Sequence, residues 1–154
     1  GDPVEIISFT ALDLITGAIP YGALEPGDDS GTLNASTTIY SVGNTGIDQE
    51  VIGESMCTTF SVLDECNPSA TSTVPENQQK FASTSLSYGS ILSTVLSSTT
   101  QNEVELDVNK STSTSTPSQG VTYWGIAVPI TITLAGSYEG LNTFYAVVAE
   151  VGDW

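Results

Sequence analysis

Short stretches in which apolar and polar residues alternate recur along most of the chain, and turn-forming residues separate them. Stretches of this kind, when rich in Val, Ile, Thr, Tyr and Phe, are typical of strands in an all-β sandwich or barrel. The pattern predicts strands at Val4 to Leu14, Thr37 to Val42, Asp48 to Gly53, Thr58 to Leu63, Gln79 to Thr84, Glu103 to Val108, Val121 to Val128, and Leu141 to Val151.

Two shorter patterns add detail. The turn GNTG at residues 43–46 lies between two alternating stretches, and its glycines and Asn44 tolerate positive φ, so it predicts a hairpin between two sandwich strands. In that hairpin Ile39 and Ser41 share one face, and Ile47, Gln49 and Val51 alternate against their neighbours. Residues 88–96 have helical spacing of apolar residues but many Ser and β-branched residues, so a short helix and a strand both stay open.

The chain has 154 residues, which is enough for one domain with a hydrophobic core and short for two. We therefore expect an all-β fold with a single β-sandwich, Ig-like or jelly-roll-like in its strand order.

Charge is scarce and one-sided. The sequence has 2 Lys, no Arg, no His and 18 acidic residues, which gives a net charge of −16. Two isolated lysines cannot form the basic patch that nucleic acid or an anionic membrane surface requires, so neither is expected as a partner. No apolar run is long enough to span a membrane. The acidity indicates an unusual habitat or bound cations, or it simply keeps the chain soluble.

Cys57 and Cys66 lie nine residues apart. Without His, they lack the partners of a zinc site, so a disulfide that closes a short loop is the favoured interpretation, and two small buried thiols are the alternative. A disulfide would indicate an oxidising, extracellular setting. The opening GDPVEIISF is what we expect of a mature chain after removal of a signal peptide.

No catalytic motif is recognisable, and the absence of His removes the usual general base, so we do not expect an enzyme or a cofactor. Calcium is a candidate ligand, with candidate residues in two acidic pairs, Asp28–Asp29 and Asp64–Glu65. Asn34 and Asn109 match the acceptor pattern for N-linked glycans, although such triplets also arise by chance in a chain rich in Ser and Thr.

The first predicted strand is apolar on both faces. Ile6, Leu12 and Leu14 lie on one parity, Ile7, Phe9 and Ala11 lie on the other, and Val4 begins the stretch. A strand of this kind favours burial on both sides, as in a strand inserted into a neighbouring molecule. An ordinary first strand of the chain's own sandwich is the alternative.

Two longer stretches, AIPYGALEPGDDSGTLNASTTIYSVGNTGIDQEVIG and YWGIAVPITITLAGSYEGLNTFYAVV, resemble the opening and closing segments of small secreted β-sandwich proteins of archaea and bacteria. Among these are the camelysin-like biofilm-fibre subunits and the archaeal bundling pili and threads. The resemblance implies polymerisation by donor-strand complementation, with residues 1–16 as the donated segment and residues 17–154 as the sandwich.

The sequence thus predicts a structural subunit of an extracellular filament, such as a pilus, thread or biofilm fibre, whose partners are copies of itself. A monomeric carbohydrate- or calcium-binding module of a cell-surface protein is the competing hypothesis. Both place the chain outside the cell or on its surface.

Overall fold

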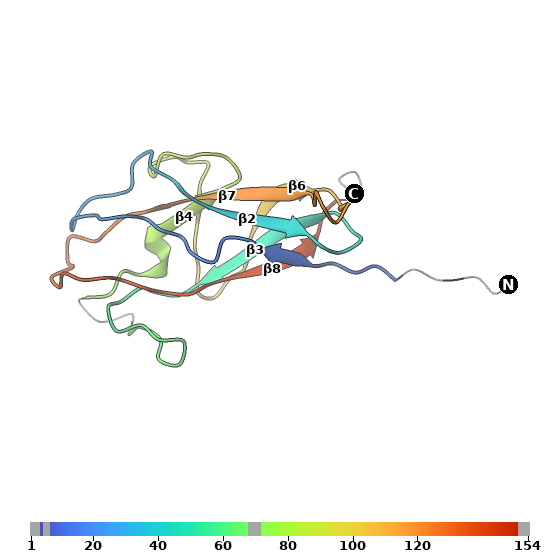
Figure 1. Ribbon diagram of the computed structural model, residues 1–154. Coiled ribbons are helices and arrows are strands. Elements are labelled where there is room, and N and C mark those ends of the chain that lie inside the picture. The colour runs from blue at the N-terminus through green and yellow to red at the C-terminus, as the bar shows by residue number, and fades with distance from the viewer. Residues whose placement is uncertain (1–3, 5–6, 68–71, 151–154) are drawn as a thin grey trace.

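The computed structural model describes residue 4 and residues 7–67 and 72–150, and within these residues it is an all-β sandwich of two antiparallel sheets (Figure 1). The larger sheet has the strand order β1-β2-β7-β4-β5 and the smaller one β6-β3-β8. The two-sheet sandwich predicted from the sequence is confirmed. The elements are β1 (Leu12–Leu14), β2 (Ala35–Ser41), β3 (Ile47–Gly53), the 3-10 helix η1 (Glu76–Gln78), β4 (Gln79–Ala82), β5 (Thr94–Val95), β6 (Asn102–Val108), β7 (Gln119–Ile126) and β8 (Asn142–Val148).

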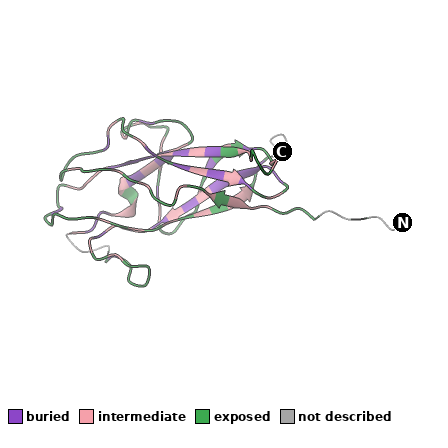
Figure 2. Cartoon of the chain, viewed as in Figure 1, coloured by how far each residue is buried: buried purple, intermediate pink, exposed green. Residues whose placement is uncertain are grey.

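The period-two alternation determines which face of each strand turns inward, as the banding along the strands in Figure 2 shows. In β2, Thr37, Ile39 and Ser41 are buried, and in β3 Ile47, Gln49 and Val51 are fully buried. The sequence pattern groups Ile39 with Ser41, and Ile47 with Gln49 and Val51, and the structure adds that both groups face inward. Asp48 departs from the pattern because it is also fully buried, although it lies on the opposite parity of β3.

Trp124 of β7 lies at the centre of the core and is fully buried. Its ring packs 5.1 Å from the ring of Phe81 and 6.0 Å from that of Phe144, centroid to centroid, so it contacts both sheets. Its indole Nε1 donates a hydrogen bond of 2.9 Å to Oγ1 of Thr37. Because the polar edge of the ring has a partner, the whole side chain can be buried without an unsatisfied donor.

The hairpin prediction for residues 37–53 is wrong. β2 pairs with β1 and β7, whereas β3 pairs with β6 and β8, so the turn at residues 43–46 carries the chain from one sheet to the other. Ile39 and Ile47, one on each side of the turn, pack into the same buried cluster across the sandwich. Alternation defines which residues of each strand share a face, but it does not define which strands pair.

Two other element predictions also fail. Thr58 to Leu63 is not a strand: Val62 and Leu63 are 78% and 94% exposed, and the segment lies in a loop. Residues 88–96 form neither a helix nor a full strand, since Ile91 and Leu92 are exposed and only Thr94–Val95 pairs with β4. In both segments most of the apolar residues lie outside the two sheets. No helix in the described part of the chain has the length and apolar character that a bilayer crossing requires.

The inward face of β3 can be tested with a matched pair of substitutions. Ile47 is fully buried and Ile130 is 82% exposed, so the same change should have different costs. We expect Ile47→Ala to lower the free energy of unfolding by about 2–5 kcal/mol, because it leaves a cavity. Ile130→Ala should change it by less than about 0.5 kcal/mol. Urea unfolding followed by Trp fluorescence measures both, and equal costs would show that Ile47 does not face the core.

Candidate functional site

The N-terminal segment, residues 7–14, lies antiparallel to β2 and to the turn that follows it. β1 is its regular part, with Leu12 opposite Ser41 and Leu14 opposite Ile39. The same register continues beyond β1: the amide of Val42 donates to the carbonyl of Ala11 at 3.1 Å, and the amide of Asn44 donates to that of Phe9 at 2.9 Å. The predicted strand Val4 to Leu14 is therefore regular only at Leu12–Leu14, while its earlier part is held by the turn.

The turn residues hold this segment closely. The side chain of Asn44 accepts a hydrogen bond of 2.6 Å from the amide of Phe9 and donates one of 3.0 Å to the carbonyl of Ile7. A Cβ atom on Gly43 would collide with the carbonyl group of Phe9, so only glycine permits this approach. The hydroxyls of Thr10 and Thr45 are also hydrogen-bonded, at 3.0 Å. The GNTG turn thus serves as an anchor for the N-terminal segment.

The two faces of the segment have different surroundings. Leu12 and Leu14 pack against the buried cluster of Ile39, Ile47 and Val108. The other parity stays uncovered. Ile7 is 78% exposed and Phe9 is 61% exposed. Together with the half-exposed Val42 of the turn, these two residues form what we call the outer apolar stripe. The segment leaves the sandwich at the same end as this turn (Figure 1), and Val4, further along, is also exposed.

β1 lies at the seam of the sandwich, because it pairs with β2 of one sheet and also contacts β8 of the other. Where β1 ends, the seam opens into a groove of 330 Å³. Its lining includes Leu14, Thr37 and Phe144, so both sheets contribute to it, and residues 16–19 run along it. The first strand is therefore the element that closes one side of the core.

Most of the residues predicted for this segment are thus located. Ala11 is half-buried, Leu12 and Leu14 face the core, and Val4, Ile7 and Phe9 are exposed. Ile6 lies outside the described residues. The sequence predicts burial on both parities, but in this single chain only the parity of Leu12 and Leu14 packs on the core, where both residues are half-buried.

The disulfide prediction is confirmed: Cys57 and Cys66 are bonded and close the loop between them. This loop lies at the end of the sandwich away from the N-terminal segment (Figure 1). Backbone hydrogen bonds between Cys57 and Glu139, of 2.9 and 3.0 Å, tie it to the chain just before β8. A disulfide is compatible with an oxidising compartment.

The two candidate glycosylation sites differ in their surroundings. The side-chain Nδ2 of Asn34 donates a hydrogen bond of 2.8 Å to the backbone carbonyl of Leu86, and its Oδ1 accepts one of 3.0 Å from the backbone amide of Leu86. The nitrogen that would carry a glycan is therefore already engaged. Asn109, directly after β6, is exposed. Of the two, Asn109 is the one that the fold leaves accessible.

The acidic pairs singled out in the sequence lie apart from each other, and neither belongs to a group of three or more acidic side chains among the described residues. Asp29 instead accepts a hydrogen bond of 2.7 Å from the amide of Gly31 within its own loop. Burial, followed by the nearby carboxylate of Glu65, raises the pKa of Glu54. Calcium binding at Asp28, Asp29, Asp64 and Glu65 stays a prediction.

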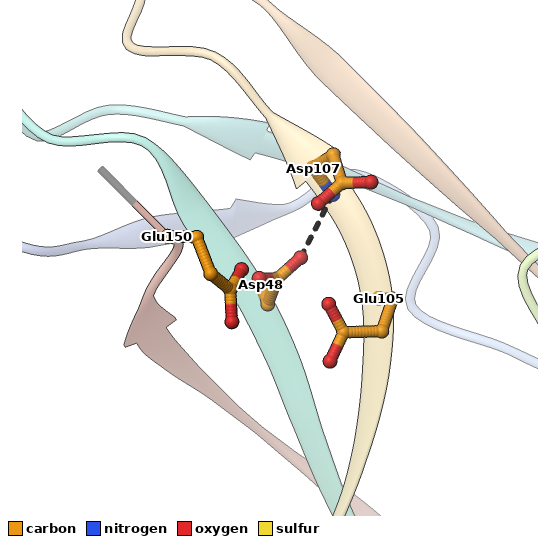
Figure 3. Close-up of side chains that lie close together, drawn as sticks. All are labelled: Asp48, Glu105, Asp107 and Glu150. Atoms are coloured by element: carbon orange, nitrogen blue, oxygen red, sulfur yellow. Dashed lines mark hydrogen bonds between the residues drawn. The ribbon is translucent and has the colours of Figure 1, made fainter. Parts of the chain in front are cut away.

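Sequence reasoning missed a different acidic group. Asp48 of β3, Glu105 and Asp107 of β6, and Glu150, two residues beyond the end of β8, bring their carboxylates together on the smaller sheet (Figure 3). One oxygen from each lies within 4.8 Å of those of the other three. We call this group the carboxylate cluster. Its one sequence signal is the closely spaced EVELD stretch at 103–107, which does not by itself identify the partners on the other two strands.

The negative charges of the carboxylate cluster repel one another. The negative charge of Asp48, followed by that of Glu150, raises the pKa of Glu105. Burial raises the pKa of Glu103, with a further contribution from the charge of Asp48. The fold therefore places like charges together, which costs free energy unless something compensates for them.

The anchoring role of the turn gives a direct prediction. Asn44→Ala removes two hydrogen bonds to the N-terminal segment, worth together about 1–3 kcal/mol. On the unassembled chain, the amide of Phe9 should exchange its hydrogen about tenfold to a hundredfold faster. Asn109→Ala, at an exposed asparagine, should leave that rate unchanged. If exchange at Phe9 does not respond to loss of the Asn44 amide, the turn does not anchor the segment.

Comparisons with known proteins add no family to this description. A scan against models of protein families finds no match for the chain, and neither does a comparison with curated protein sequences. The chain is therefore described by its fold, a two-sheet antiparallel β-sandwich, and by its sites.

Proposed function

We propose that this protein is the structural subunit of an extracellular filament, in which the N-terminal segment of each copy binds to β2 of the next copy. The observation that carries the proposal is the segment itself. It is apolar on both parities, its inner leucines complete the core, and its outer apolar stripe is uncovered in a single chain. A second copy of the chain is the partner that supplies both an identical acceptor and a cover for the stripe.

The contacts of the segment suit an exchange between copies. They include main-chain hydrogen bonds to residues 38–44, the two bonds with the Asn44 side chain, the bond between the hydroxyls of Thr10 and Thr45, and the packing of two leucines. All of them form equally well with the segment of a neighbour, because they do not depend on the chain connection. Strand exchange between identical subunits is a low-cost route to assembly for this reason, and main-chain pairing supplies much of the cohesion.

The connection after β1 is short, and this determines how close the copies lie. Ile19 packs against the core cluster around Trp124, and the amide of Ile15 donates a hydrogen bond of 2.9 Å to the carbonyl of Thr38, so the exposed or half-buried residues 16–18 are available as a hinge. From Leu14 to Ile19 an extended chain spans at most about 18 Å. If Leu14 packs against the neighbouring copy while Ile19 packs against its own sandwich, the two sandwiches must be in contact. The outer apolar stripe, on the exchanged segment, then lies at their junction.

Other observations agree with this proposal. The disulfide favours an oxidising compartment, as expected for an extracellular or cell-surface protein. The sequence resemblance to the camelysin-like biofilm-fibre subunits and the archaeal bundling pili and threads, which couple by donated strands, supports the same assembly.

The first test compares the intact chain with one that lacks residues 1–15, by size-exclusion chromatography with light scattering and by negative-stain electron microscopy. We expect the intact chain to form long fibres and the truncated chain to form none. Since truncation also removes Leu12 and Leu14 from the core, a synthetic peptide of residues 1–15 should bind the truncated chain and restore its stability without producing fibres.

A matched pair of full-length variants separates assembly from folding. Phe9→Ser replaces an apolar side chain of the outer apolar stripe, and Ile91→Ser replaces one that is 96% exposed elsewhere. The first should reduce fibre formation at least tenfold with little change in thermal stability, and the second should leave it unchanged. If the intact chain and the chain lacking residues 1–15 both stay monomeric and folded, the filament proposal fails. A monomeric binding module then becomes the better account.

A further inference from the structure

The carboxylate cluster is built on an irregular part of the smaller sheet. The pairing of β3 with β6 shifts register here: Ile47 lies opposite Val108, but Gln49 lies opposite Val104. Residues 105–107 of β6 therefore bulge opposite Asp48, and Asp107 has a φ of 50°, in the left-handed region. The bulge brings Glu105 and Asp107 toward the same side chain of β3 (Figure 3). Bulges of this kind re-aim side chains and are frequent beside functional sites.

Asp48 holds the bulge and is itself incompletely satisfied. Its Oδ1 atom accepts hydrogen bonds of 2.8 Å from the amide of Leu106 and 2.7 Å from that of Asp107. Its Oδ2 atom is buried and has no hydrogen-bond partner. The residue is fully buried, so this oxygen does not reach bulk water. A buried carboxylate oxygen without a partner is costly, and an ion or a water bound at that point is one way in which native proteins offset the cost.

The surroundings favour a cation as the missing partner. Three further carboxylates lie around Asp48 within 4.8 Å, and they raise the electrostatic cost of leaving the site without a positive charge. The chain has few cations of its own to offer. One of its two lysines, Lys80, lies on the other sheet, where its Nζ donates to the carbonyl of Tyr88 at 3.1 Å and lies 4.4 Å above the Tyr88 ring.

The donor set identifies the class of ion. All four side chains offer carboxylate oxygens, the chain has no His, and its two cysteines form a disulfide. Hard divalent cations prefer such ligands, whereas zinc and copper favour nitrogen or sulfur. Calcium takes six to eight oxygens in flexible geometry, while magnesium demands a near-ideal octahedron. Three exposed carboxylates around one buried carboxylate fit the flexible arrangement better.

We propose that Asp48, Glu105, Asp107 and Glu150 bind one calcium ion, with Oδ2 of Asp48 as its buried ligand. The ion joins the three strands of the smaller sheet, because its ligands come from β3, from β6 and from Glu150, two residues beyond the end of β8. It neutralises part of the repulsion within the cluster and fixes the bulge. The site differs from the acidic pairs indicated by the sequence, and it does not depend on the filament proposal.

The test uses the full chain, freed of metal with EGTA, in 150 mM NaCl so that diffuse counterion binding is screened. Isothermal titration with calcium chloride should show one saturable site per chain with a dissociation constant below about 1 mM. Glu105→Gln should weaken binding at least tenfold. Its control is Glu25→Gln, the same change at an exposed glutamate outside the cluster, which should stay within twofold of the unmodified chain. Magnesium should bind at least tenfold more weakly than calcium.

Unfolding measurements show whether Glu105→Gln acts on calcium binding or on folding. Glu105 is exposed, so its substitution is compatible with the fold, and unfolding in EGTA should show similar stability for both variants. Calcium should raise the unfolding temperature of the unmodified chain and of Glu25→Gln more than that of Glu105→Gln. No saturable binding, or binding that Glu105→Gln does not weaken, would overturn the proposal, as would equal affinity for calcium and magnesium.

Discussion

The seam between the two sheets has to be closed by a strand, and β1 is the strand that closes it. Ile39 and Ile47 come from different sheets and meet Val108 at this seam, where Leu12 and Leu14 of β1 cover the cluster that they form. Without β1, this side of the core would be open to water. The strand that closes it is the first one in the chain, and a segment of four residues joins it to the rest of the sandwich.

This constraint explains why the filament proposal centres on the N-terminal segment. Leu12 and Leu14 cover the core at the seam, and under the filament proposal a neighbouring copy supplies them. The opposite parity of the segment has no such role within one chain, yet Ile7 and Phe9 are apolar. An uncovered apolar strand beside a sheet edge promotes association, and natural sheets usually carry charges or Pro at such places. Here the sequence retains hydrophobic residues, as an assembly surface requires.

Charge acts against any such assembly. With a net charge of −16, copies repel one another at low ionic strength, and strand exchange has to overcome that repulsion. A calcium ion in the carboxylate cluster would remove two of these charges from each copy. The two proposals are nevertheless independent, because the cluster lies on the smaller sheet and its ligands do not include the N-terminal segment.

The sequence predicted the features that depend on local pattern. Alternation indicated which residues of β2 and β3 share a face, and the spacing of Cys57 and Cys66 indicated their disulfide. Local pattern does not determine strand pairing. It therefore predicts a hairpin at the GNTG turn, although this turn links two sheets. The carboxylate cluster was missed for the same reason. Its members are separated by up to about a hundred residues in the sequence, and only the pairing of β3 with β6 and β8 brings them together.

The most direct test of the central claim asks whether the first strand pairs within a chain or between chains. Asp13 and Tyr40 are direct partners across β1 and β2, and neither side chain lies in the core, so cysteines at both positions can form a disulfide when the strands are paired. The variant carrying Asp13→Cys and Tyr40→Cys would be oxidised as fibres, denatured and separated on a non-reducing gel. Strand donation predicts a ladder of covalent multimers. Fibres whose cross-linked chains all migrate as monomers would contradict it.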